Sequence, residues 1–132
     1  MDKIYVDTNI FLDALEDRDG CARDLGTPAM SIFSQAAHGR FKIIVSDWTL
    51  EELYKHADHE EVKELLSKLG DQMIRCGYTQ EQKKKAKQDA KHWQDYLHGL
   101  IANEEDADCI ITQNVRDLRD LSGLKVKRPG YI

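Results

Sequence analysis

The sequence alternates short apolar segments with longer segments whose apolar residues recur at helical spacing. Three segments, 4–6, 41–45 and 109–112, are short and mostly apolar. Near-continuous hydrophobicity over so few residues is typical of strands that are buried on both faces. Strands of this kind, alternating with helices, form a parallel sheet covered by helices on each side. The pattern therefore predicts an α/β fold, a three-layer α/β/α sandwich with a central parallel sheet of four to five short strands.

The apolar spacing predicts helices between the strands. We expect them near residues 10–15, 30–37, 50–57, 58–69 and 79–102, the last a single long helix. Thr79 and Gln82 have the spacing of a capping box at the start of that helix. The remaining expectations are a loop over 17–28, a helical turn from Asn114 to Leu121 and an edge strand over 125–127, while 70–77 receives no assignment.

Length and composition narrow the class of protein. A chain of 132 residues is expected to form one domain, residues 1–132. It lacks the run of about 20 apolar residues that spans a membrane, and its N-terminal acids do not suit a secretion signal. Three cysteines without a C-x-x-C pattern favour a reduced, cytoplasmic protein. The net charge of −5 argues against non-specific coating of nucleic acid.

Acidic and amide side chains follow the predicted strands. Asp7 follows the first strand, Glu52 comes shortly after the second, and Asn114 and Asp117 follow the third. Asp95 lies on the helix that leads back to the third strand. Ligands of open α/β sheets bind beyond the carboxyl ends of the strands, so we expect these side chains to converge there.

Converging carboxylates repel one another unless a cation lies between them. Oxygen ligands suit Mg²⁺ or Mn²⁺, and no dense His or Cys cluster favours zinc. Such a metal polarises a phosphoryl oxygen and generates hydroxide near neutral pH. The residues therefore favour hydrolysis of a phosphodiester.

Four segments resemble, in order, the motifs of PIN domains, and the chain length suits a stand-alone PIN protein of the VapC toxin type. They are Val6–Asp13, Ser46–Leu53, Asp95–Ala102 and Asp108–Leu118. The resemblance implies a Mg²⁺- or Mn²⁺-dependent ribonuclease with an RNA substrate, homodimeric and paired with an antitoxin. It implies that Asp7, Glu52 and Asp95 hold the metal, while Asp117 either acts as a further catalytic acid or serves only the fold as a helix-stabilising residue. Supporting roles fall to Thr8, Asn9, Thr112 and Asn114. Many members carry an acid where this chain has Asn114, which leaves a weakened or non-catalytic scaffold that binds RNA or a protein as an alternative.

Other interpretations of the same residues stay open. Thr49 to Glu52 also has the spacing of a capping box, which would give Glu52 a purely local role. His98 is expected to be a helix-face residue rather than a ligand. Lys83, Lys84, Lys87 and Lys91 form either a solvated face or contacts to RNA phosphates. An aspartate-based phosphatase is a weaker alternative, because its second Asp would occupy position 9, which is Asn.

Overall fold

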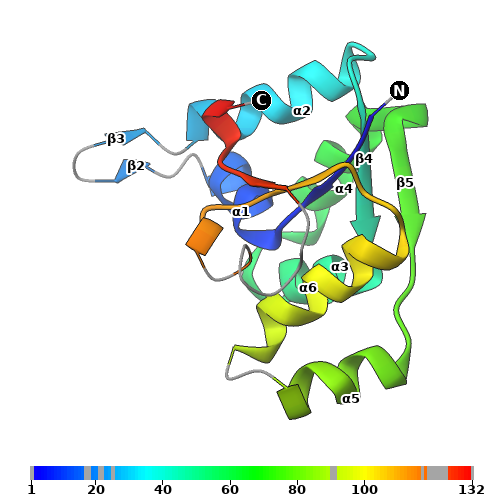
Figure 1. The fold of residues 1–132 in the computed structure, drawn as a ribbon. Helices are drawn as coiled ribbons and strands as arrows, with labels where there is room; N and C mark the ends of the chain where they lie inside the picture. Colours follow the sequence, from blue (N-terminus) through cyan, green and yellow to red (C-terminus); the bar gives the residue numbers. More distant parts are fainter. Residues whose placement is uncertain are drawn as a thin grey trace.

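Figure 1 shows the computed structural model, which describes residues 2–16, 19–20, 23–24, 26–89, 92–116, 118 and 125–131. Its main sheet has five strands in the order β5-β4-β1-β6-β7. Every neighbouring pair in this sheet is parallel. The strands are β1 (Lys3–Val6), β4 (Lys42–Ser46), β5 (Met73–Cys76), β6 (Cys109–Ile111) and β7 (Val126–Lys127). The predicted parallel sheet of four to five short strands, including its edge strand near 125–127, is thus confirmed.

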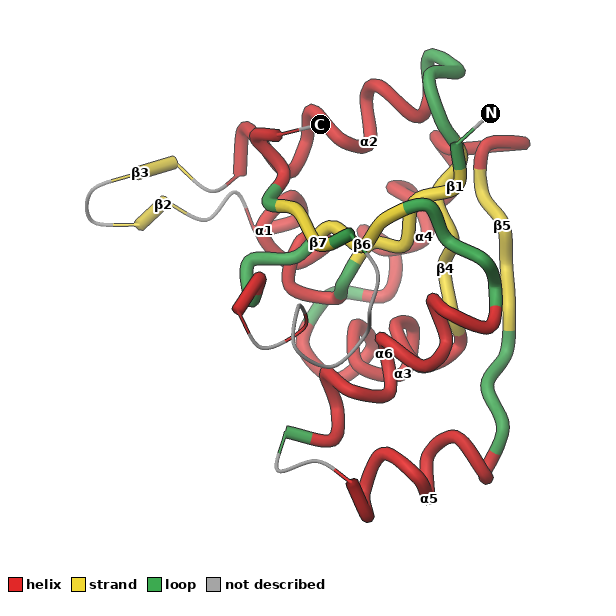
Figure 2. The backbone as a smooth tube through the Cα atoms, in the orientation of Figure 1, coloured by secondary structure: helices red, strands yellow, loops and turns green. Residues whose placement is uncertain are grey.

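Helices connect and cover the strands, as Figure 2 shows. They are α1 (Thr8–Glu16), α2 (Gly26–Ala37), α3 (Asp47–His56), α4 (His59–Leu69), α5 (Gln80–Asp89) and α6 (Trp93–Glu104). Two short 3₁₀ helices are η1 (Gly70–Gln72) and η2 (Pro129–Tyr131). In the part of the chain that the structure describes, no helix combines the length and the apolar character needed to cross a membrane.

Alternate residues of each strand point to opposite faces of the sheet, and each face has its own core. Ile4 and Val6 of β1 pack into a cluster that includes residues of α1, α2 and α4. Tyr5, between them, belongs to a second cluster with residues of α5 and α6. Helix α3 contributes to both, with Leu53 in the first and Trp48 in the second. The two cores account for the near-continuous hydrophobicity of the strands and confirm the three-layer architecture.

One expectation about the connecting segments was wrong, and one segment without an assignment contains a strand. The segment 17–28 contains a small antiparallel ladder of β2 (Asp19–Gly20) and β3 (Arg23–Asp24), and α2 already begins at Gly26. The unassigned segment 70–77 contains β5, whose residues are exposed or only half-buried. β2 and β3 contain only charged residues and glycine, and the charged Arg75 interrupts the apolar residues of β5, so neither segment has the uninterrupted apolar run on which the prediction depended.

The single long helix expected over 79–102 is two helices. Helix α5 ends at Asp89, and α6 begins after His92, whose backbone is not helical (φ −103°, ψ 67°). The apolar spacing in the sequence continues from Ala86 to Trp93 and Leu97, so periodicity alone could not reveal the break.

The start of α5 has the predicted capping box. The amide of Gln82 donates to Thr79 Oγ1 at 3.0 Å, and the amide of Thr79 donates to Gln82 Oε1 at 2.8 Å. Replacing an N-cap Thr by Ala removes a partner of an otherwise unpaired amide. We therefore expect Thr79→Ala to lower the free energy of unfolding by about 1 kcal/mol. Urea unfolding measures this, with the exposed Ser67→Ala as the control; equal values for wild type and Thr79→Ala would contradict it.

Candidate active site

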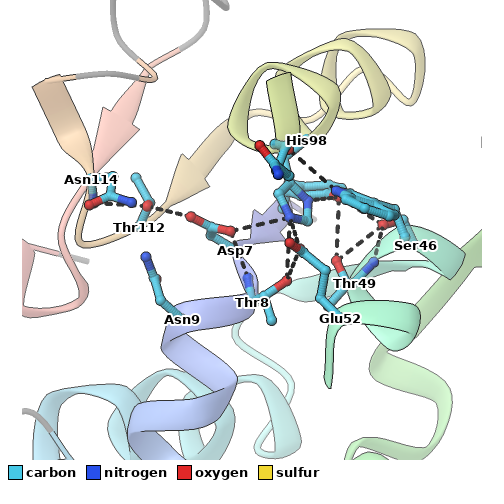
Figure 3. A network of polar contacts seen from close by, with 12 residues as sticks. Asp7, Thr8, Asn9, Ser46, Thr49, Glu52, His98, Thr112 and Asn114 are labelled. Atoms are coloured by element: carbon cyan, nitrogen blue, oxygen red, sulfur yellow. Dashed lines mark hydrogen bonds and ion pairs between the residues drawn. The ribbon is translucent and has the colours of Figure 1, made fainter. Parts of the chain in front are cut away.

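Three strand ends meet at one edge of the sheet, and a polar network joins them (Figure 3). Asp7 directly follows β1, Ser46 is the last residue of β4, and Thr112 directly follows β6. The three strands are parallel neighbours, which is why residues far apart in the sequence come together here. The predicted position of the functional residues, beyond the carboxyl ends of the strands, is where this network lies.

Asp7 is a buried carboxylate held on both oxygens. Only 3% of the residue is exposed. Its Oδ1 accepts a hydrogen bond from the amide of Thr8 at 2.7 Å, and its Oδ2 accepts one from Thr112 Oγ1 at 2.7 Å. These donors compensate for the loss of water around the buried charge and fix the orientation of the carboxylate. Thr8 and Thr112, predicted as supporting residues, both contact it.

Glu52 extends from α3 to the same network. Its Oε1 accepts from Thr8 Oγ1 at 2.7 Å and lies 2.6 Å from His98 Nε2. The alternative that Glu52 only caps its own helix was wrong, because α3 begins two residues before Thr49 and Ser46 is its N-cap. The amide of Thr49 donates to Ser46 Oγ, and Glu52 is turned toward other elements.

His98 bridges the two carboxylates. Its Nε2 is 2.6 Å from Glu52 Oε1 and 3.4 Å from Asp7 Oδ1, and the residue is 1% exposed. Burial alone would lower the pKa of His98, but the influence of Tyr5, Asp7 and Glu52 raises that pKa well above 6.5. Burial would likewise raise the pKa of Glu52, yet its bond to His98 and the imidazolium charge lower it from 4.5. His98 and Glu52 thus form an imidazolium–carboxylate pair.

The second nitrogen of His98 is held from the opposite side. Its Nδ1 lies 2.6 Å from the hydroxyl of Tyr5, which also contacts Ser46 Oγ at 2.8 Å. With both ring nitrogens protonated, Nδ1 donates to Tyr5 and Nε2 donates to Glu52. The two hydrogen bonds fix the orientation of the imidazole ring, so that Nε2 faces the carboxylates.

Three residues of the network were not predicted to belong to the site: His98, Tyr5 and Ser46. His98 was expected to lie on the face of a helix without a role in the site, yet it is fully buried at the centre of the network. The available signal was a histidine within a run of apolar and small residues, from Leu97 to Ala102, because such a residue needs polar partners when buried. Tyr5 carried no signal, since tyrosine is ordinary in a buried strand.

The remaining predicted site residues are placed differently. Asp95 lies half-buried in the first turn of α6, three residues before His98 and so on the same face of the helix. Asn9 Oδ1 accepts from the amide of Gln113 at 3.4 Å. Asn114 is exposed, and its amide donates to Thr112 Oγ1 at 3.0 Å. Asp117 lies outside the described residues.

The donor chemistry of this site fits a hard divalent cation. Asp7 and Glu52 offer carboxylate oxygens, the ligands that Mg²⁺ and Mn²⁺ prefer. Within the described part of the chain, the hydrogen bonds of Glu52 all involve Oε1, which leaves Oε2 available. Among the same residues, no group of three or more His, Cys, Asp or Glu side chains has the arrangement of a metal site. The charge of His98, which contacts both acids, offsets the repulsion between them.

No protein-family model and no curated protein matches the sequence. Among solved structures, the chain is similar to a chain in the crystal structure of VapBC2 from Rickettsia felis bound to a DNA fragment from their promoter. The TM-score is 0.63 and the identity 17%, and the match covers 96% of this chain and 98% of that chain. This chain has the PIN-like fold. At 17% identity the match concerns the fold, and it confirms the architecture that the motifs implied.

Proposed function

We propose that this protein is a metal-dependent endoribonuclease that hydrolyses RNA phosphodiester bonds, and that it is the toxin of a toxin–antitoxin pair. The observation that carries the proposal is the meeting of Asp7 and Glu52. They come from different elements, yet one imidazole contacts both of them at the strand ends. Placing a buried and a partly buried carboxylate side by side costs folding free energy, so their meeting at the ends of the strands favours a function there over a structural role.

In this proposal Asp7, Glu52 and Asp95 hold Mg²⁺ or Mn²⁺, with Asp117 as a further acid. A divalent ion at this position supplies an activated water and stabilises charge on the phosphate. The residues around it act on the acids themselves. Thr8 and Thr112 donate to Asp7 and keep its carboxylate fixed, as partners of metal-binding carboxylates do in other proteins. His98 offsets the repulsion between Asp7 and Glu52.

The toxin role is supported by the kind of protein that the fold is similar to. The similar structure is a VapBC2 complex bound to promoter DNA. By that likeness, we propose that an antitoxin partner binds this chain and that the chain forms a homodimer in the cytoplasm.

A second candidate is a PIN-like scaffold with weakened catalysis that binds RNA or a protein. Asn114 favours it, since many PIN domains carry an acid at that position and here the exposed residue is neutral. The two candidates share the fold, and they differ in whether the protein cleaves RNA.

RNA cleavage tests the proposal. We expect purified protein to cut single-stranded RNA in Mg²⁺ or Mn²⁺, to stop in EDTA and to recover when metal is added in excess. A small phosphomonoester should stay intact, which separates the nuclease from an aspartate-based phosphatase. If the protein binds RNA but leaves it intact at every metal concentration, the nuclease proposal is wrong and the non-catalytic scaffold is the better account.

A further inference from the structure

A polar pocket of about 410 Å³ adjoins the candidate site and shares Glu52 with it. It lies between α3 and α5 and reaches the first turn of α6. Its lining consists of Trp48, Glu51, Glu52, Lys55, His56, Lys83, Lys87, Trp93 and Gln94. Lys55 also contributes to lowering the pKa of Glu52, so the charges of the pocket and of the site influence each other.

Cations gather in this pocket although the chain as a whole is acidic. Three lysines against two glutamates give the lining a positive balance with His56 neutral, whereas the net charge of the chain is −5. Among the described residues, the ion pairs found within 4.0 Å include neither Lys83 nor Lys87. Their charges are therefore available to an anion.

Two tryptophan rings make cation–π contacts with these lysines. Trp48 and Trp93 lie with their ring centroids 5.4 Å apart at an angle of 34°. Lys83 Nζ lies 5.6 Å from the centroid of Trp48, and Lys87 Nζ lies 4.8 Å from that of Trp93. Cation–π contacts of this length orient an ammonium group without neutralising its charge. Both ammonium groups therefore lie over tryptophan rings at the pocket, with Lys83 half-buried and Lys87 exposed to solvent.

Phosphate is the anion that this arrangement suits. Lysine binds phosphate as a point charge without reading the base. If a phosphodiester is cut beside Glu52, the adjoining phosphates of the same strand pass close to it. We propose that this pocket binds the backbone phosphate next to the scissile one in single-stranded RNA, through Lys83 and Lys87, an inference that rests on the proposed function.

The chain offers a direct probe, because Trp48 and Trp93 are its only two tryptophans and both line the pocket. In EDTA, which prevents cleavage, we expect a short single-stranded RNA of mixed sequence to change the intrinsic tryptophan fluorescence saturably. Lys83→Gln combined with Lys87→Gln should weaken binding by roughly tenfold at about 0.1 M salt. The slope of log K against log[salt] should become shallower by about 1.4, the value for two phosphate contacts on a single strand.

Two matched variants complete the experiment. Lys63→Gln with Lys68→Gln removes the same charge from exposed positions on α4, on the opposite face of the sheet, and should bind RNA as wild type does. Lys83→Arg with Lys87→Arg should restore binding, since arginine also contacts phosphate and stacks on aromatic rings. Thermal unfolding of each variant verifies the fold.

The outcomes separate the inference from the proposed function. Equal affinities and salt slopes for the two Gln pairs would overturn the inference, even if wild type cleaves RNA. A fluorescence change produced by poly-glutamate but not by RNA would overturn it in favour of an acidic protein partner. If RNA binding depends on Lys83 and Lys87 but no metal supports cleavage, the pocket is a phosphate-binding site and the proposed nuclease activity is wrong.

Discussion

Asp7→Asn is expected to reduce RNA cleavage by more than about 100-fold while leaving the fold intact. Loss of an outer partner of a metal ligand already costs about 10–100-fold in metal affinity or activity, and loss of a ligand should cost at least as much. Asparagine has nearly the same shape and retains an oxygen that accepts a hydrogen bond from Thr8 or Thr112. The change therefore removes charge more than it removes packing.

The matched control is Asp71→Asn. Asp71 is an exposed acid in η1, which directly precedes β5, so it lies at the amino ends of the parallel strands and the site lies at their carboxyl ends. It should cleave RNA as wild type does. The measurement is the initial rate of cleavage of a labelled RNA in Mn²⁺, with circular dichroism to verify the fold. A folded Asp7→Asn protein that cleaves at the rate of the control would remove Asp7 from the proposed mechanism.

Replacing His98 is expected to have the largest effect on stability. In His98→Ala the buried Asp7 and the partly buried Glu52 lose the imidazolium between them. Breaking a buried charge pair by removing one partner costs about 3–5 kcal/mol, because the other charge remains uncompensated. Urea unfolding should show this loss. Adding Glu52→Gln to His98→Ala should restore part of it, and strictly additive losses would contradict a direct interaction.

The same pair predicts how stability depends on pH. Because the folded-state pKa of His98 is raised above 6.5, its stabilisation is complete below pH 6.5 and is lost as the pH rises through the raised value. The folded-state pKa of Glu52 is lowered from 4.5, so its stabilisation is complete above pH 4.5 and is lost as the pH falls through the lowered value. Stability should therefore be greatest between about pH 4.5 and 6.5.

His98→Gln isolates the histidine contribution, since glutamine donates a hydrogen bond but does not titrate. Its free energy of unfolding should change little between pH 6.5 and 8, while that of wild type falls. The exposed His38→Gln should follow wild type. A wild-type stability that rises over this range would show that His98 is not held in its charged form.

The sequence contained enough to predict the layers of the fold because burial on both faces leaves a hydrophobic signal. The segments that became β1, β4 and β6 are apolar on both faces since each face of the sheet has its own core. β5 gave a weaker signal, because the exposed Arg75 interrupts its apolar residues and none of the four is fully buried. An edge strand of this kind is recognised only once its neighbour β4 is in place.

For the site, position along the strands located Asp7 and Glu52, but the contacts between them could not be predicted. These contacts depend on how α6 crosses the sheet, which brings His98 within hydrogen-bonding distance of Tyr5 and Glu52. Sequence spacing says which residues share a helix face and does not say which strand end that face meets. From the sequence, a metal ion was expected to offset the repulsion between the carboxylates, and a protonated histidine was not considered for this role.

Metal binding tests the central claim most directly. Isothermal titration of the metal-free protein with Mn²⁺ should reveal binding in wild type and in Asp71→Asn. The signal should be lost or weakened at least tenfold in Asp7→Asn and in Glu52→Gln. If wild type binds no Mn²⁺, or if both site variants bind it with wild-type affinity, the pocket at the strand ends is not a metal site and the proposed hydrolysis has no basis there.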